Sequence, residues 1–216
     1  MSDKKRPRHQ ARRPEPVEVP ATARPDWIAV ALSAAGLAVS AYLTWLKWSG
    51  GEARFCLAGN GCDIVQASRY ATFLGVPTAL WGGVLYIAIG VLGWLGLAAN
   101  RWLAAFLLAA AGVGFSLYLT YLSLFVIGGA CVYCLASTAI ILALGLVLIW
   151  RRPAASGRRS PFRPIRLATN GVLAAVAAIA FGAFVHAAPS SAPPGYQLAL
   201  ARHLKETKAV MYGAFW

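Results

Sequence analysis

Residues 131–150 read CVYCLASTAIILALGLVLIW. The segment carries no charged residue, and its length matches the roughly 20 apolar residues that a helix needs to cross the hydrocarbon core of a bilayer. It starts with the motif Cys131-Val-Tyr-Cys134, which follows the helix-breaking pair Gly128–Gly129. The segment therefore predicts a transmembrane helix with a Cys-x-x-Cys motif in its first turn.

Four further segments have the same apolar character. The chain is 59% hydrophobic and 12% charged, whereas about a quarter of the residues of an ordinary soluble domain are charged. The first apolar run is longer than the core of a cleaved signal peptide, so we count it as a span. The chain is therefore predicted to be an all-α membrane protein of five transmembrane helices. The additional spans are residues 27–48, 76–98, 102–127 and 167–188.

The net charge of +13 comes mainly from two basic blocks, residues 4–24 and 151–166. Basic blocks beside apolar segments are typical of membrane orientation, in which Lys and Arg stay on the cytoplasmic side. With five spans, both blocks and Arg101 fall on one side, which is predicted to be the cytoplasm. A nucleic-acid-binding surface is not predicted. The extracytoplasmic side then holds residues 49–75, residues 128–129 and the tail after residue 188.

All four cysteines fall on this extracytoplasmic side, where disulfides form and persist. Cys131 and Cys134 are three residues apart, which places them on one helix face at a separation close to that of a disulfide. The helix N-terminus favours a thiolate, and burial opposes it. Small buried side chains and a four-cysteine zinc site are the alternatives. Two close pairs in an oxidising compartment favour redox-active dithiols instead.

The other pair lies in the segment Cys56-Leu-Ala-Gly-Asn-Gly-Cys62. Gly59, Asn60 and Gly61 are turn formers, so a Cys56–Cys62 disulfide is sterically easy. A structural disulfide across such a short loop adds little stability, which favours a mobile pair that exchanges electrons with two partners. A static staple is the alternative.

The two cysteine pairs occur together with Ser68-Arg69-Tyr70, Gly75-Val76-Pro77, Gly82 and Tyr86. Over about residues 27–150 this pattern resembles the vitamin K epoxide reductase-like membrane oxidoreductases in their bacterial form. The resemblance implies a four-helix bundle that binds a quinone, of the ubiquinone or menaquinone (vitamin K) type, near its mouth. In bacterial members a fifth helix joins this bundle to a thioredoxin-like domain.

The C-terminal segment after the fifth helix is similar to the start of such a domain. A stretch with the composition of a linker, PSSAPPG, is followed by a predicted polar helix and an apolar strand, AVMYGAFW. This ending resembles the first strand of a thioredoxin-like domain, truncated here; an unrelated tail is the alternative. The predicted organisation is a disordered basic cytoplasmic tail (1–25), a catalytic bundle (26–150), a cytoplasmic loop (151–166), a fifth helix (167–188), and a linker with the start of a thioredoxin-like domain (189–216).

The resemblance and the two pairs together imply an electron relay. A reduced thioredoxin-like partner in the periplasm, fused or separate, attacks the Cys56–Cys62 disulfide, and Cys56 forms the mixed disulfide. Cys62 then reduces the Cys131–Cys134 disulfide, and Cys134 passes the electrons to the membrane quinone. The expected function is disulfide formation in extracytoplasmic proteins, and the expected location is the bacterial plasma membrane.

The candidate walls of the quinone site are aromatic side chains, because a quinone ring needs a flat apolar slot with hydrogen-bond donors. These candidates are Trp81, Tyr86, Tyr118 and Tyr121. Aromatic residues of membrane proteins also fill the core or the interface, which is the alternative for each.

Two positions depart from the family pattern. Asp63 follows the second loop cysteine, where family members often have serine, and Thr138 stands where the animal enzymes have tyrosine. Vitamin K epoxide is therefore not the expected natural substrate, whereas quinone reduction is.

Two other classes of membrane protein compete with this interpretation. The four-helix disulfide-forming protein of bacteria carries its Cys-x-x-Cys in the first outer loop, whereas here that motif comes second and at a helix start. A non-enzymatic protein, such as a transporter, stapled by two disulfides is the main alternative. Charges within the membrane are the usual mark of a transport path, and only Lys47 lies within a predicted span.

Overall fold

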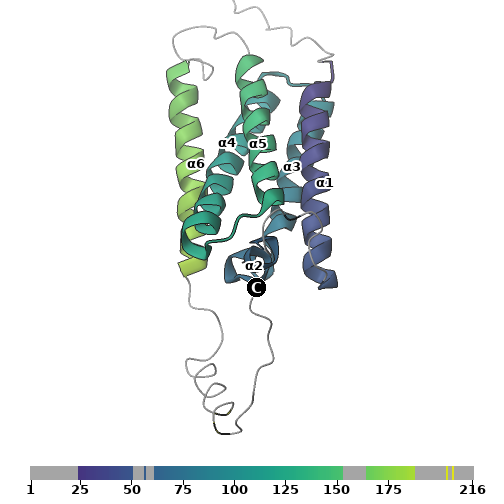
Figure 1. The fold of residues 1–216 in the computed structure, drawn as a ribbon. Coiled ribbons are helices and arrows are strands. Elements are labelled where there is room, and N and C mark those ends of the chain that lie inside the picture. Colours follow the sequence, from purple (N-terminus) through teal and green to yellow (C-terminus); the bar gives the residue numbers. More distant parts are fainter. Residues whose placement is uncertain are drawn as a thin grey trace, which may run out of the picture.

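The computed structural model describes residues 24–50, 56, 61–152, 164–187, 203 and 206. Its main body consists of long helices that run up and down side by side (Figure 1). Four of them are long and apolar enough to cross a membrane, and α3, with 17 residues, is at the lower limit of spanning lengths. The predicted all-α membrane fold is confirmed. The long helices are Trp27–Ser49 (α1), Thr78–Trp94 (α3), Ala99–Tyr121 (α4), Val132–Trp150 (α5) and Pro164–Ala187 (α6).

The helix ends differ by a few residues from the predicted bounds. The second long helix starts at Thr78, because Val76–Pro77 (β2) pairs with Thr72–Phe73 (β1) in a two-stranded antiparallel sheet. The third starts at Ala99 and continues beyond Tyr121 as the π-helix Leu122–Ile127 (η2). The predicted N-terminal tail, the basic loop and the thioredoxin-like segment lie wholly or mostly outside the described residues.

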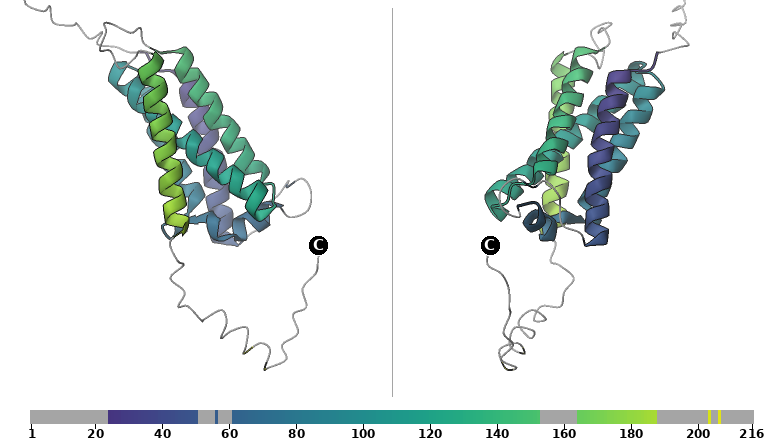
Figure 2. Two further views of the ribbon diagram at one scale, coloured as in Figure 1. Left: turned by 90° about the vertical axis from the view of Figure 1, so that its left-hand side faces the viewer. Right: turned by 45° about the vertical axis from the view of Figure 1, so that its right-hand side comes forward.

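α1, α3, α4 and α5 form a four-helix bundle, and α6 packs along α4 on its outside (Figure 2). Glycines allow the closest approaches. A Cβ on Gly36 of α1 would lie 2.3 Å from the Tyr86 ring of α3, and a Cβ on Gly114 of α4 would lie 2.6 Å from the Ala175 carbonyl oxygen of α6. Small residues therefore allow close helix packing at both contacts, as is common in membrane proteins.

The bundle core lies between α3, α4 and α5. Trp102 is almost fully buried, stacks on Phe106, and donates its indole N–H to the Leu148 carbonyl at 3.0 Å. This bond joins α4 to α5 and satisfies the polar atom of a large buried side chain. The main buried side chains are Tyr86, Ile89, Trp102, Phe106, Ile141, Leu144, Leu148 and Leu167.

An ion pair connects the helices at the end of the bundle away from the cysteines. Asp26 caps α1 by accepting a hydrogen bond from Ala29 N at 3.2 Å, and its other carboxylate oxygen lies 2.8 Å from Arg151 at the end of α5. Asp26 is only 5% exposed, whereas the Arg151 side chain is about half exposed. The pair therefore fixes where α1 begins relative to α5.

We expect Asp26→Ala to lower the free energy of unfolding by about 1–2 kcal/mol, because it removes a helix cap and a half-exposed ion pair that contributes less than about 1 kcal/mol. Asp26→Asn is the control, since it retains a capping oxygen and loses only the charge. The midpoint temperature of thermal unfolding in detergent should be highest for wild type, lower for Asp26→Asn and lowest for Asp26→Ala. Equal stability of the Ala and wild-type proteins would contradict this assignment.

Residues 61–77, between α1 and α3, are folded, although residues up to 75 were predicted as a loop. Residues 61–77, which we call the cap, contain the helix Gly61–Ala67 (α2), the 3-10 turn Arg69–Ala71 (η1) and the β1–β2 hairpin. Lys47 Nζ donates to the Gln66 carbonyl at the end of α2, and Thr78 Oγ1 donates to the Tyr70 carbonyl. These bonds hold the cap against α1 and α3 and thereby set the position of α2.

Candidate redox site

Cys131 and Cys134 lie at the start of α5, as predicted. Cys131 is the N-cap residue, and its Sγ accepts a hydrogen bond from Cys134 N at 3.3 Å. The Cys134 thiol donates to Cys131 Sγ, with the two sulfur atoms 2.8 Å apart. A disulfide needs a sulfur separation of about 2.05 Å, so the two free thiols can close to a disulfide with a small movement.

The hydrogen bonds on Cys131 stabilise its thiolate form. The thiol of Cys134 donates to it first of all, burial acts in the opposite direction, and the backbone N–H groups of Cys134 and Tyr133 add to the stabilisation. Together they lower the pKa of Cys131 to about 7. Because the thiolate is the nucleophilic form of cysteine, Cys131 is the member of this pair that is prepared for thiol exchange near neutral pH.

The other pair is a disulfide between Cys56 and Cys62, with Cα atoms 6.1 Å apart. Cys62 sits in the first turn of α2 and is fully buried, whereas Cys56 is half-buried. The two residues were predicted to share a mobile loop, and Cys62 is instead held by a helix. Residues 57–60, with the predicted turn formers Gly59 and Asn60, lie outside the described part of the chain.

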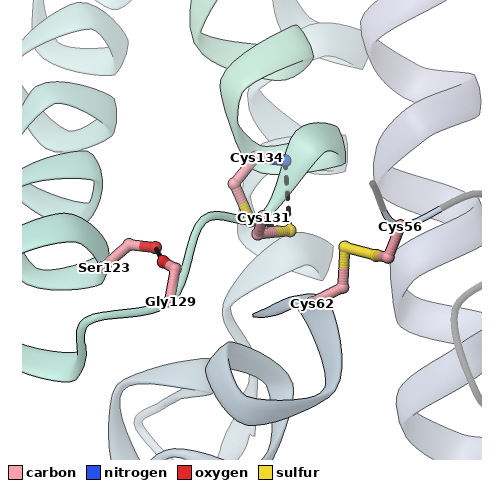
Figure 3. Close-up of a disulfide and its surroundings, with 6 residues drawn as sticks. All are labelled: Cys56, Cys62, Ser123, Gly129, Cys131 and Cys134. Atoms are coloured by element: carbon pink, nitrogen blue, oxygen red, sulfur yellow. Dashed lines mark hydrogen bonds between the residues drawn. A yellow bond between two sulfur atoms is a disulfide. The ribbon is translucent and has the colours of Figure 1, made fainter. Parts of the chain in front are cut away.

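The start of α2 lies directly against the residue that precedes the Cys-x-x-Cys motif. A Cβ on Gly61 would lie 2.7 Å from the Ala130 carbonyl oxygen, and a Cβ on Gly129 would lie 3.1 Å from the Gly61 carbonyl oxygen. Figure 3 shows the Cys56–Cys62 disulfide and Cys131 facing each other across this contact. The fold thus brings together two pairs that are about 70 residues apart in the sequence.

The pKa of Cys131 can be measured from its thiolate absorbance in reduced protein in which Cys56 and Cys62 are replaced by alanine. We expect the absorbance to rise with pH around a midpoint of about 7, because Cys131 is a thiol below this value and a thiolate above it. Replacing Cys134 by alanine as well removes the main donor, so the midpoint should move toward about 8.5, the value of an ordinary cysteine. An unchanged midpoint would refute the assigned cause.

Cys134 lies on the other side of the motif and lines a cavity inside the bundle. The cavity is closed on one side by the cap, through Gln66 and Tyr70, and on another by the π-helix, through Leu122 and Ser123. A π-helix places an extra residue in its turn and is frequent at functional sites. Ser123 is buried and donates to the Gly129 carbonyl at 2.5 Å, which orients the chain that leads into Cys131.

The cavity walls combine apolar side chains with hydroxyl groups. Thr138 donates to the Cys134 carbonyl at 2.9 Å, Thr120 donates to the Ser116 carbonyl at 2.8 Å, and the two threonine hydroxyls are 3.2 Å apart. Both hydroxyls therefore lie at the wall that carries Cys134. The remaining lining includes Ser40, Leu43, Thr78, Gly82, Phe115, Leu119, Ile127 and Ser137.

The four predicted aromatic residues do not line the Cys134 cavity. Tyr86 is buried and bonds Ser137 through its hydroxyl, and Trp81 donates to the Phe73 carbonyl; both line a second cavity next to the first. Tyr118 stacks on His186 of α6, and Tyr121 is 58% exposed. Their role in quinone binding stays a prediction.

Sequence reasoning missed most of the cavity residues, including the polar ones. Thr138 follows Cys134 by four residues and therefore shares its helix face, which is a signal that the sequence contains. Thr120 and Tyr70 come from other elements, and no spacing in the sequence connects them with Cys134.

Comparison with known proteins agrees with this geometry. The model of the vitamin K epoxide reductase family matches residues 27–149, which run from α1 into α5 and include all four cysteines. The chain is also similar to the thiol-disulfide oxidoreductase LTO1 of Arabidopsis thaliana, with 30% identity over 200 residues. That match covers 82% of this chain and 53% of the relative, so the chain spans about half the length of that protein. The family model covers more than half of this chain, and the chain accordingly belongs to the vitamin K epoxide reductase family.

Proposed function

We propose that this chain oxidises the dithiol of a protein partner and delivers the electrons to a membrane quinone, so that disulfides form outside the cytoplasm. One observation carries the proposal. The Cys131–Cys134 pair lies between two places, with Cys131 facing the Cys56–Cys62 disulfide and Cys134 lining an internal cavity. A pair in this position can accept electrons on one side and release them on the other.

The different burial of Cys56 and Cys62 gives the exchange a direction. Cys56 is half-buried and Cys62 is fully buried, so a partner thiolate reaches the sulfur of Cys56. The attack forms a partner–Cys56 disulfide and releases Cys62 as a thiolate next to Cys131. Each such step exchanges one disulfide for another through a mixed disulfide, and the electron count is conserved.

In the next step Cys62 attacks Cys131 of the oxidised Cys131–Cys134 pair, and Cys134 leaves as a thiolate. The second thiol of the partner then releases Cys56, and Cys56 attacks Cys62 to restore the resting disulfide and free Cys131. The partner ends as a disulfide, and the Cys131–Cys134 pair ends as a dithiol.

The chemistry of the cavity fits a quinone ring. Phe115, Leu43 and Leu119 supply apolar surface, and Thr120 and Thr138 place hydroxyl groups beside Cys134. Each hydroxyl would turn from its own helix carbonyl to donate to a bound ring, and a few polar groups in an apolar wall are what orients small ligands. A bound quinone would supply an acceptor for two electrons and two protons. The residues of this chain would hold the ring against Cys134 and exclude bulk water.

The proposed partner is a thioredoxin-like protein, fused or separate, and the proposed location is the bacterial plasma membrane. The partner follows from the resemblance of the C-terminal residues to the start of such a domain. The orientation is supported by the basic residues: Arg101, Arg151 and Arg166 lie at the ends of helices away from the cysteines, as expected for a cytoplasmic side.

The proposal is tested by anaerobic quinone reduction with the purified protein and a reduced thioredoxin-like domain in trans. The expected result is continuous quinone reduction that requires both the chain and the dithiol domain. A Cys56→Ala/Cys62→Ala protein should lose activity with the domain but keep it with a small dithiol that reaches Cys131 directly. If no quinone is reduced with several domains while the protein stays folded, the two pairs are structural and the chain is a stapled membrane protein.

A further inference from the structure

The Cys134 cavity adjoins a second cavity in the bundle. The two share four lining residues from three helices: Gly82, Phe115, Ser116 and Ser137. The second cavity extends from Phe73 of the cap to Ile141 in the middle of α5. A ligand with its ring beside Cys134 therefore has this second cavity directly next to it.

The second cavity has an apolar wall that belongs to α6. Ala178 and Phe181 of α6 line it opposite Trp81 of α3, and Phe181 and Trp81 are 54% and 42% exposed. These exposed side chains place the opening on the lipid-facing surface, at the seam between α3 and α6. The further lining is almost entirely apolar and comprises Phe73, Leu85, Tyr86, Ala111, Gly112 and Ile141.

The position of α6 at this seam is fixed by close contacts with α4. A Cβ on Gly114 would lie 2.6 Å from the Ala175 carbonyl oxygen, and a Cβ on Gly182 would lie 2.8 Å from the Phe115 ring. Ala178 lies between these two contacts on α6. The two contacts pack α6 closely against α4 and thereby place Ala178 in the wall of the slot.

We propose that the apolar tail of the quinone leaves the Cys134 cavity through this slot between α3 and α6, so that Ala178 and Phe181 select quinones by their tails. The inference rests on the proposed function, because it needs the quinone ring beside Cys134. It assigns to the fifth helix a role in recognising the substrate, in addition to any role in connecting the bundle to the segment that follows.

A groove between α1 and α3 is the competing route. It is lined by Leu37, Trp45 and Ile87 and shares Ser40 and Ala79 with the Cys134 cavity. α1 and α3 touch at this level, since a Cβ on Gly82 would lie 3.3 Å from Ser40 Oγ and a Cβ on Gly83 would lie 3.6 Å from both Leu37 and Ser40. This close approach narrows the way from the cavity into the groove, and the Cys134 cavity shares four lining residues with the second cavity but two with the groove.

The test compares the binding of two quinones that share one ring, one with a long polyprenyl tail and one without a tail. Dissociation constants are measured by quenching of tryptophan fluorescence in oxidised protein. Ala178→Phe fills the slot and should raise the constant for the long-tail quinone by about tenfold or more, the size of effect that overpacking has on an occupied site. The constant for the tail-free quinone should change by less than about twofold, which also reports an intact ring site.

Two further variants, each with an alanine replaced by phenylalanine at another position, serve as controls. Ala180→Phe adds a ring to an exposed position of α6 outside the slot and should leave both constants unchanged. Ala41→Phe fills the α1–α3 groove and should also have no effect. If Ala41→Phe weakens the binding of the long-tail quinone and Ala178→Phe does not, the tail leaves by the groove and the inference is wrong. If wild type binds neither quinone, the proposed function fails instead.

A second measurement uses the unaltered chain. A quinone with a photoreactive group in the first unit of its tail should label Phe73, Trp81 or Phe181 after irradiation, as located by mass spectrometry. Labelling confined to Leu37, Trp45 or Trp48 of the groove would overturn the inference. This outcome does not depend on turnover or on the folding of a variant.

Discussion

Replacing Cys134 with alanine is expected to lower the rate of dithiol-dependent quinone reduction by at least about 1000-fold, as the loss of an essential nucleophilic group does in other enzymes. Cys134 is the sulfur that lines the cavity, and no other described cysteine does so. Without it, electrons that reach Cys131 have no dithiol from which to leave as a pair. The rate is measured anaerobically by quinone absorbance, with Leu135→Ala, at an exposed neighbouring position of α5, as the control substitution.

The same variant should also accumulate a disulfide that the wild type does not hold. The reaction starts from the form of the chain in which Cys56–Cys62 is closed and Cys131 is a thiol. The thiolate of Cys131 can attack Cys62, so that a Cys62–Cys131 bond forms and Cys56 leaves as a thiolate. In the wild type Cys134 resolves this bond by attacking Cys131, which closes the Cys131–Cys134 disulfide and releases Cys62 as a thiolate. In the Cys134→Ala protein, alkylation of the released Cys56 prevents it from attacking Cys62 again. The Cys62–Cys131 disulfide then remains and can be identified by mass spectrometry of the peptides.

The presence or absence of the Cys62–Cys131 disulfide decides whether the two cysteine pairs exchange with each other. The Cys131→Ala protein is the control and should keep its Cys56–Cys62 disulfide under the same alkylation. If the Cys134→Ala protein also keeps Cys56–Cys62 and shows no Cys62–Cys131 peptide at mildly alkaline pH, the two pairs do not exchange, and the relay through Cys62 is wrong.

Gly36→Ala is expected to lower the free energy of unfolding by about 2–4 kcal/mol. Its new Cβ would lie 2.3–2.6 Å from three atoms of the Tyr86 ring, and overpacking of a core costs about 1–3 kcal/mol. Tyr86 is 2% exposed and its hydroxyl bonds the Ser137 carbonyl at 2.9 Å. Moving the ring therefore also breaks a buried hydrogen bond between α3 and α5, which costs about 1 kcal/mol more.

The matched control is Gly145→Ala in α5, where the nearest side-chain atom is Val113 Cγ2 at 4.0 Å. This change meets no obstacle and gains the about 0.5–1 kcal/mol by which alanine exceeds glycine within a helix. The free energy of unfolding, measured in detergent micelles, should therefore fall for Gly36→Ala and rise for Gly145→Ala. A Gly36→Ala protein as stable as the Gly145→Ala protein would mean that Tyr86 is loosely held, and it would return Tyr86 to consideration as a ligand contact.

The periodic features of the sequence predicted the fold well, because a membrane imposes simple rules on them. A span must be long and apolar, so the segments ending at Trp48 and Trp150 could be located within a few residues of the helices observed. The alternation of basic and uncharged connections placed both cysteine pairs at one end. The Cys131–Cys134 motif was correctly assigned to a helix start, because Gly128 ends the preceding helix in a left-handed conformation.

The contacts between distant segments could not be predicted in the same way. Cys62 was assigned to a loop because Gly59, Asn60 and Gly61 favour turns, but burial against Ala130 and the bond from Lys47 to Gln66 hold it in a short helix. The aromatic residues were chosen for chemistry alone. Whether a ring faces the cavity or the lipid depends on the rotation of each helix, which packing decides.

The position of Cys131 also bears on the main alternative to an enzyme. Cys131 faces the Cys56–Cys62 disulfide, and the hydrogen bonds on its sulfur lower the pKa of its thiol to about 7. A thiolate is the form that exchanges with disulfides, so this arrangement favours cycling cysteines over staples.

The central claim is that the four cysteines form one path to a quinone, and the most direct test is the amount of quinol formed by fully reduced protein without any partner. Four thiols give two disulfides and four electrons, and each quinone takes up two electrons. Mixed anaerobically with excess quinone, the wild-type chain should therefore form two quinols per chain, the Cys56→Ala/Cys62→Ala protein one, and the Cys134→Ala protein none. If the wild-type chain forms none while it remains folded, the cysteines do not lead to a quinone and the account is contradicted.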